Sequence, residues 1–145
     1  MAPSGVVGRS SRQDWPNAVS RTATDHDLLL VIDDWVRLLE AEDYQAAFDF
    51  ADPDPGQRWT ADLVRLVIKS YGEADELQRA TVEGVPTDVA QRKEVDRWPA
   101  NARGTVGEVW YDLNIDGLAS DLTATFDILE LPEGLGLRLR DVHVM

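Results

Sequence analysis

No cysteine occurs among the 145 residues of the chain, and this absence excludes several kinds of chemistry. Without thiols the chain has no disulfide framework, no thiolate-bound metal and no cysteine nucleophile. The only two histidines, His26 and His143, stand at opposite ends of the part that we expect to fold. A site with several histidine ligands therefore does not form within one chain. We expect neither a metal nor a cofactor.

Positive charge is scarce as well. Lysine and arginine together number 14 against 27 aspartates and glutamates, which gives a formal net charge of −13. Such an excess of negative charge repels the phosphate backbone of nucleic acids and the headgroups of anionic lipids. The composition therefore predicts no nucleic-acid partner and no membrane partner.

Long apolar runs are missing from the N-terminal segment. The longest run there, Val6-Val7, is far shorter than the apolar core of a secretion signal or a membrane span, so the sequence predicts a cytoplasmic protein. Residues 1–24 are rich in serine, arginine, proline and glycine, which is typical of a disordered or loosely docked tail. Trp15-Pro16 is a candidate docking point for this tail. We expect a single domain over residues 25–145.

Familiar catalytic and nucleotide-binding motifs are also absent. The chain contains no G-x-x-x-x-G-K, G-x-G-x-x-G, G-x-S-x-G or H-E-x-x-H pattern. Nucleotide-binding, dinucleotide-binding, serine-hydrolase and zinc-protease functions therefore have no local support.

Three segments of the first half carry apolar residues at helical spacing. Thr24 and the aspartate three positions later form a capping-box pattern that predicts a helix over residues 25–41. Asp43 predicts the start of a second, short helix, and Thr60 predicts the start of a third that closes at Gly72. The apolar residues that repeat at helical spacing are Leu28, Ile32, Trp35, Val36 and Leu39, then Tyr44, Ala47, Phe48 and Ala51, then Leu63, Val64, Val67, Ile68 and Tyr71.

The second half of the chain has the pattern of apolar and polar residues that is typical of β-strands. Apolar and polar residues alternate over residues 104–115 and 120–131, and Asp116-Gly117 between them is a hairpin-turn pair. Two weaker strands are expected over residues 79–85 and 91–98, which are rich in β-branched or aromatic side chains.

A last strand begins after Pro132-Glu133-Gly134 and changes phase along its length. Its leucines occupy odd positions up to Leu139, whereas Val142 and Val144 occupy even positions. A β-bulge near Arg140-Asp141 accounts for this change and bends the strand. Helices first and an antiparallel meander afterwards indicate an α+β fold, with the N-terminal helices packed on one face of a curved antiparallel sheet.

One pair of residues near the C-terminus has catalytic potential. Asp141 and His143 are alternate residues of the last strand and share a face, so the carboxylate can orient the ring and raise its pKa, as a general base requires. Tyr111, Asp112 and Asp121 on neighbouring strands are candidates for a further polar group in such a site. The alternative interpretation is a surface pair at the end of the sheet.

A second feature is a run of acidic residues between Arg37 and Arg58. The usual interpretation of such a run is a solvated corner between helices. The alternative is a docking surface for a basic protein partner, with Tyr44 or Trp59 as an aromatic anchor. The acidic residues, called the acidic corner below, are Glu40, Glu42, Asp43, Asp49, Asp52 and Asp54.

Two resemblances extend these predictions. The segments GEVWYDL (107–113), SDLTATF (120–126) and DVHVM (141–145) resemble those of a family of small bacterial proteins that has no assigned activity, so no functional residue is implied. The order of elements and the pattern around Trp35 to Ala47 are similar to the nuclear-transport-factor-2-like, cystatin-type cone. That resemblance implies helices seated in a strongly curved sheet, a fold that hosts isomerases, dehydratases and binding modules.

Three functions remain open from the sequence. The first is a non-enzymatic binding module, such as an immunity-type or accessory protein, whose acidic surface engages a basic partner. The second is a small-molecule isomerase or dehydratase of the cone-shaped kind, with Asp141, His143, Tyr111 and Asp121 around a deep pocket. The third is a structural or regulatory homodimer that pairs its sheets.

Overall fold

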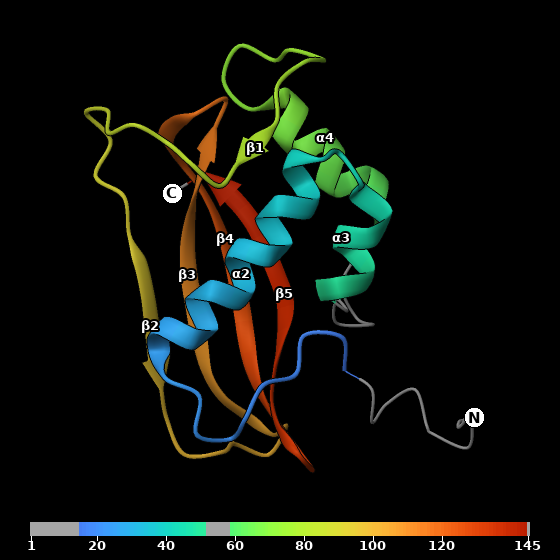
Figure 1. The fold of residues 1–145 in the computed structure, drawn as a ribbon, viewed down its shortest axis with the longest axis vertical. Coiled ribbons are helices and arrows are strands. Elements are labelled where there is room, and N and C mark those ends of the chain that lie inside the picture. Colours follow the sequence, from blue (N-terminus) through green and yellow to red (C-terminus); the bar gives the residue numbers. More distant parts are fainter. Residues whose placement is uncertain (1–14, 52–58, 145) are drawn as a thin grey trace.

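The computed structural model describes residues 15–51 and 59–144. Within these residues, helices α2 (Asp25–Glu40), α3 (Tyr44–Ala51) and α4 (Ala61–Ser70) lie against one face of a five-stranded antiparallel sheet (Figure 1). The three predicted helices are confirmed, as is the α+β class.

The helix ends follow from the residues that the sequence places there. At the start of α2, Asp27 N–H donates to Thr24 Oγ1 at 3.1 Å and Thr24 N–H donates to Asp27 Oδ2 at 2.9 Å, which is the predicted capping box. These bonds from Thr24 lower the pKa of Asp27. At the end of α4, Gly72 takes the left-handed conformation, with a φ of 63°, that glycine adopts at least cost.

Three long strands form the body of the sheet. β3 (Thr105–Ile115), β4 (Leu118–Leu131) and β5 (Gly134–Val144) follow one another as an antiparallel meander. The shorter β1 (Ala80–Thr81) and β2 (Lys93–Arg97) both pair with the edge of β3 that β4 leaves open.

The strand predicted over residues 79–85 is wrong in extent, because pairing with β3 stops after Thr81. At Val82, side chains take the place of the neighbouring strand as hydrogen-bond partners of the backbone. Val82 N–H donates to Glu40 Oε1 at 2.8 Å, and Asn114 Nδ2 donates to Val82 O at 2.9 Å. The backbone groups of Val82 are thus satisfied by α2 and by a side chain of β3, and the chain returns to the sheet at Val85, which forms an isolated parallel bridge to Leu118.

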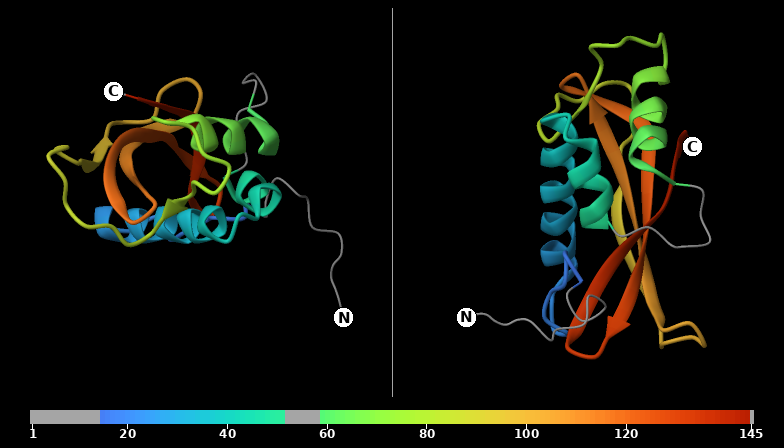
Figure 2. Two further views of the ribbon diagram at one scale, coloured as in Figure 1. Left: turned by 90° about the horizontal axis from the view of Figure 1, so that it is seen from above. Right: turned by 90° about the vertical axis from the view of Figure 1, so that its right-hand side faces the viewer.

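The sheet is strongly curved and unclosed, and α2 lies across its open side (Figure 2). The apolar side chains of β3, β4 and β5 fill the concave face together with those of the helices. At the centre, the rings of Trp35 and Phe126 meet edge to face with centroids 5.1 Å apart. The predicted arrangement of helices on a curved antiparallel sheet is therefore confirmed.

The predicted β-bulge is confirmed at Arg140. Thr125 pairs with Asp141 and Phe126 pairs with Leu139, so Arg140 is an extra residue in β5. The insertion turns Val142 into the core. The face of the sheet away from the helices, called the outer face below, then carries Glu108, Trp110, Asp112, Thr123, Thr125, Asp127, Arg138, Asp141 and His143.

The segment before α2 packs against the free edge of β5. Asn17 is buried, and its side chain accepts from Leu137 N–H at 2.8 Å and donates to Leu137 O at 2.8 Å and Phe50 O at 2.7 Å. Val19 forms an antiparallel bridge to Leu135, and Trp15 Nε1 donates to Leu137 O at 3.0 Å.

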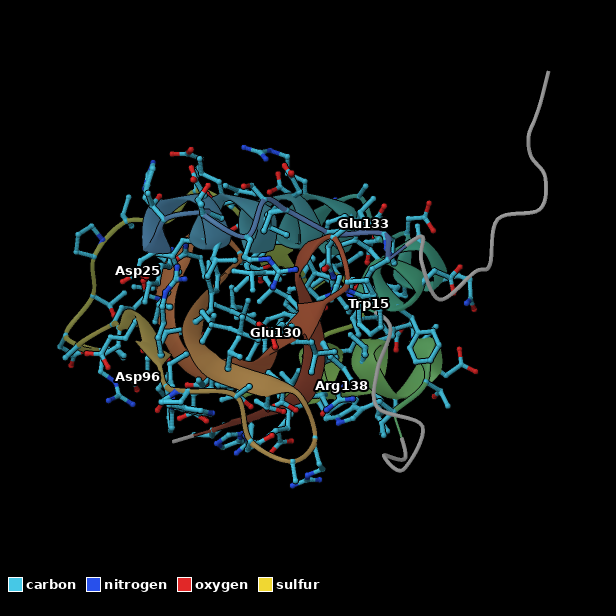
Figure 3. The ribbon with its side chains drawn as sticks, turned by 90° about the horizontal axis from the view of Figure 1, so that it is seen from below. Trp15, Asp25, Asp96, Glu130, Glu133 and Arg138 are labelled. Carbon is cyan, nitrogen blue, oxygen red and sulfur yellow. The ribbon has the colours of Figure 1, made fainter. Side chains whose placement is uncertain are left out.

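Because of this packing, only part of the segment predicted as a tail, residues 1–24, can be described as part of the fold. Residues 15–24 belong to the fold, whereas residues 1–14 lie outside the described part of the chain. Seen from below, Trp15 lies on the side of Arg138, away from Asp25 and Asp96 (Figure 3). The docked segment satisfies an edge that would otherwise offer unpaired backbone groups to another chain.

The role of Asn17 is testable by replacing it with alanine. The change leaves Leu137 N–H without its acceptor and removes the bond to Phe50 O, whereas Leu137 O keeps the bond from Trp15, so we expect a loss of about 2 kcal/mol in the free energy of unfolding. Urea denaturation followed by tryptophan fluorescence measures it. Ser20→Ala, at an exposed position of the same segment, is the control. Equal stability of the two variants would contradict this role.

Candidate functional site

The catalytic pair suggested by the sequence lies on the outer face of β5. His143 Nδ1 is 3.0 Å from Asp141 Oδ2, and both side chains are partly exposed. The ring of His143 also meets the ring of Trp110 edge to face, with centroids 6.3 Å apart. The Asp141 carboxylate thus lies beside the imidazole on a partly exposed surface.

Tyr111 lies on the opposite face of the sheet. It is buried against the helices, and its hydroxyl donates to Asp33 Oδ1 of α2 at 2.5 Å. Burial raises the pKa of Tyr111 well above its ordinary value, and the bond to the Asp33 carboxylate raises it further. The structure therefore separates Tyr111 from His143 by the thickness of the sheet.

The other two acidic candidates are engaged elsewhere. Asp121 Oδ1 accepts from the hydroxyl of Tyr71, just after α4, at 2.5 Å. Asp112 accepts from Arg92 N–H at 2.7 Å and from Thr123 Oγ1 at 2.6 Å. Each carboxylate thus fixes a neighbouring element, and the contact between Asp141 and His143 is the part of the predicted constellation that the fold assembles.

The carboxylates of the acidic corner hold the helices in place. Glu40 accepts the backbone N–H of Val82, Asp43 Oδ1 accepts Ala46 N–H at 3.1 Å and so starts α3, and Asp49 Oδ1 accepts from Gln45 at 3.0 Å. Asp52 and Asp54 lie outside the described residues.

Glu42 forms a structural ion pair. Its carboxylate accepts from the ammonium group of Lys69, whose side chain is buried at the end of α4. This hydrogen bond lowers the pKa of Glu42. The pair gives a buried cation its counter-ion and ties the corner between α2 and α3 to α4.

A cavity of about 420 Å³ lies beside the turn between β3 and β4, where α4 ends. We call it the hairpin cavity; in Figure 1 it is at the end of the molecule where α4 and β1 are labelled. Its lining residues come from three stretches of the chain: Tyr71, Gly72, Glu73 and Gln78, then Thr87, Asp88 and Val89, then Ile115, Asp116, Leu118, Ala119 and Ser120.

Side-chain and backbone hydrogen bonds fix the walls of this cavity. Gln78 Nε2 donates to Ile68 O at 2.7 Å and to Tyr71 O at 2.8 Å, which closes the end of α4. Thr87 Oγ1 donates to Ala119 O at 3.1 Å and also accepts Val89 N–H at 3.0 Å. The cavity is therefore formed before any ligand binds.

The hairpin cavity combines negative charge with apolar surface. Glu73, Asp88 and Asp116 line it, and the described lining includes no lysine or arginine. Apolar side chains form the remaining wall and rim: Val89, Ile115 and Leu118, the last with half of its surface exposed. Nearby, Leu77 and Val85 are also exposed, at 81% and 56%. Exposed apolar side chains beside a cavity are typical of a binding site.

Sequence reasoning did not find this cavity. The turn explains Asp116 and Gly117, the third predicted helix explains Tyr71 and Gly72, and residues 73–78 and 87–89 belong to no periodic element. The available signal was Leu118, an apolar residue directly after a turn, with the acidic residues Glu73 and Asp88 in the two flanking loops.

The described residues contain no group of three or more histidine, cysteine, aspartate or glutamate side chains arranged to hold a metal ion. Their helices are also too short or too polar to cross a membrane.

Comparison with known proteins gives a family. The model of a domain of unknown function, DUF7668, matches residues 36–145. The chain belongs to the DUF7668 family. No curated protein and no solved structure matches the chain. The resemblance to the nuclear-transport-factor-2-like cone stays a prediction.

The DUF7668 region includes every element that builds the hairpin cavity and the outer face, because it begins within α2 and reaches the end of the chain. The segment that covers the edge of β5, including Trp15 and Asn17, precedes this region.

The pair formed by Glu42 and Lys69 predicts a pH dependence of stability. In Glu42→Gln we expect a loss of about 1 kcal/mol at neutral pH, because Lys69 is buried while Glu42 is partly exposed and screened by water. The pKa of Glu42 in the folded protein lies below its ordinary value of 4.5. The contribution is therefore fully present above that pH and is lost as the pH falls through the folded-state value.

Urea unfolding of both proteins between about pH 7 and pH 3 measures this effect. The difference in stability should shrink at the acid end. Glu133→Gln, at an exposed position in the turn before β5, is the matched control and should show no such trend. A difference between Glu42→Gln and the parent protein that is constant at every pH would contradict the assignment.

Proposed function

We propose that this DUF7668 protein is a non-enzymatic binding module that holds a basic segment of a partner protein in the hairpin cavity. The observation that carries the proposal is the lining of that cavity. Three carboxylates from separate stretches of the chain, Glu73, Asp88 and Asp116, surround a preformed space, and the described lining has no cation to neutralise them.

A lysine or arginine side chain matches this lining in both of its parts. Its methylene stem packs on the apolar wall of Val89, Ile115 and Leu118, while its charged group meets the carboxylates. The exposed leucine and valine side chains around the cavity add apolar contact area for the residues on either side of the cation. The proposed ligand is therefore a basic residue flanked by apolar ones.

The charge of the whole molecule supports the same kind of partner. A net charge of −13 attracts basic surfaces and speeds their encounter with the protein, and salt screens this attraction. The acidic corner contributes to this long-range field, but its described carboxylates are already bonded within the chain. Of the three carboxylates in the hairpin cavity, Asp116 accepts the backbone N–H of Arg79 at 3.0 Å, whereas within the described residues those of Glu73 and Asp88 accept no hydrogen bond. We therefore place the close contact with the partner at the hairpin cavity.

The edges of the sheet disfavour the alternative of a homodimer built by strand pairing. The edge of β5 is covered by Asn17 and Val19. Two copies of β2 paired antiparallel about Val95 would place Glu94 of one copy opposite Asp96 of the other, and like charges in that position are destabilising. A charged edge of this kind is a known device against association.

The enzymatic alternative depends on Asp141 and His143. Their contact favours it, but the pair lies partly exposed on the outer face, and Tyr111 lies on the other face. A general base that acts on a small molecule needs a pocket and a second polar group beside it. The lining of the hairpin cavity offers both a preformed space and charge complementarity, so we favour binding.

The test uses two synthetic peptides of equal length and identical apolar residues, one with two lysines and one with two glutamines in their place. We expect the protein to bind the lysine peptide, with an affinity that falls as salt is added. In the double variant Glu73→Gln, Asp88→Asn the affinity should fall about tenfold, since two charge-assisted contacts are lost. Fluorescence anisotropy of labelled peptides measures both effects.

The matched control is Asp43→Asn, Asp49→Asn, which removes two charges from the described part of the acidic corner instead of the cavity. It should bind the lysine peptide almost as well as the parent protein. Equal binding of the two peptides, or an equal loss in the control variant, would sink the proposal.

A further inference from the structure

A second cavity, of about 310 Å³, lies on the outer face of the sheet beside the loop between β2 and β3. We call it the arginine pocket. We propose that it binds the carboxylate group of a small organic acid with a flat apolar body. Its lining residues are Trp98, Asn101, Arg103, Thr105, Asp127, Arg138 and Arg140.

A buried carboxylate holds two of the arginines in place. Asp127, whose side chain is only 10% exposed, accepts from Arg138 Nη2 and from Arg140 Nη1, each at 3.1 Å. Arg140 also reaches Glu108 Oε1 at 3.3 Å. The hydrogen bond to Asp127 raises the pKa of Arg140 above its ordinary value, so this guanidinium stays charged.

The lining places three arginines beside one carboxylate, in an otherwise acidic protein. Arg138 and Arg140 are engaged with Asp127, whereas within the described residues the guanidinium of Arg103 forms no hydrogen bond or ion pair. Arg103 is therefore the cation offered to an incoming anion. A carboxylate brings a negative charge and a planar pair of oxygens that suits a guanidinium group.

The loop that carries Arg103 is fixed in position. Asn101 Oδ1 accepts Arg103 N–H at 2.9 Å and Thr105 N–H at 3.0 Å. Glu130 N–H donates to Gly104 O at 2.8 Å, which ties the loop to β4. The arginine is therefore presented by a rigid loop, and less ordering entropy is lost when a ligand binds.

Trp98 supplies the apolar wall. Its indole Nε1 donates to Thr105 O at 3.1 Å, which fixes the ring, and 37% of its surface remains exposed. A flat apolar group attached to the carboxylate can pack on this ring. The pocket therefore distinguishes an aromatic or similarly flat acid from a bare anion.

The inference is independent of the proposed function, because the two cavities share no lining residue. The hairpin cavity has an acidic lining, and the arginine pocket has a surplus of basic side chains. Loss of peptide binding at the first therefore leaves the second proposal untouched.

The experiment is a nuclear magnetic resonance titration that follows the indole N–H signal of Trp98, assigned with the variant Trp98→Phe. The probes are benzoate, its neutral analogue benzamide, and inorganic phosphate. We expect benzoate to shift the signal saturably, benzamide to leave it unmoved, and phosphate to bind more weakly than benzoate. In Arg103→Gln the affinity for benzoate should fall about tenfold, since one charge-assisted contact is lost.

Arg37→Gln, which removes an exposed arginine of α2 outside the pocket, is the matched control and should bind benzoate like the parent protein. Arg103 is itself exposed, so its replacement is expected to leave the fold intact. The proposal is overturned by the absence of a benzoate effect, by an equal effect of benzamide, by tighter binding of phosphate, or by unchanged affinity in Arg103→Gln.

Discussion

The insertion of Arg140 into β5 determines which side chains each face of the sheet presents. If Arg140 occupied a regular position of the strand instead of a bulge, strict alternation after Leu139 would turn Asp141 and His143 toward the helices and Val142 toward water. With the bulge, the core keeps a continuous apolar face. Arg138, Arg140, Asp141 and His143 all belong to the outer face, where Asp127 gathers the two arginines.

Two of the cavities of the described structure have linings of opposite charge. The hairpin cavity lies where α4 ends and where loops 71–78 and 87–89 meet the turn between β3 and β4. The arginine pocket lies beside the loop between β2 and β3 and is lined from the outer face. The acidic lining of the hairpin cavity agrees with the net charge of −13, whereas the lining of the arginine pocket is locally basic. Both cavities are preformed by hydrogen bonds, which lowers the entropy lost when a ligand binds.

Local sequence patterns predicted the helices and strands of the fold, whereas contacts between residues far apart in the sequence determine which side chains line each site. The capping pattern at Thr24 and the change of parity after Leu139 act within a few residues, so the sequence contained them. The bond between Tyr111 and Asp33 depends on how α2 crosses the sheet, and no spacing in the sequence reports that. The same holds for the hairpin cavity, whose lining combines residues more than 40 positions apart, as Tyr71 and Ser120 are.

The central claim is that a basic segment binds in the hairpin cavity. The most direct measurement is a map of backbone amide chemical-shift changes in the protein as the lysine peptide is added. The account predicts the largest changes around the cavity, at Gly72, Val89, Leu118 and Ala119. Changes concentrated instead between Glu40 and Asp49, the described part of the acidic corner, or on the outer face of β5 around His143, would contradict it.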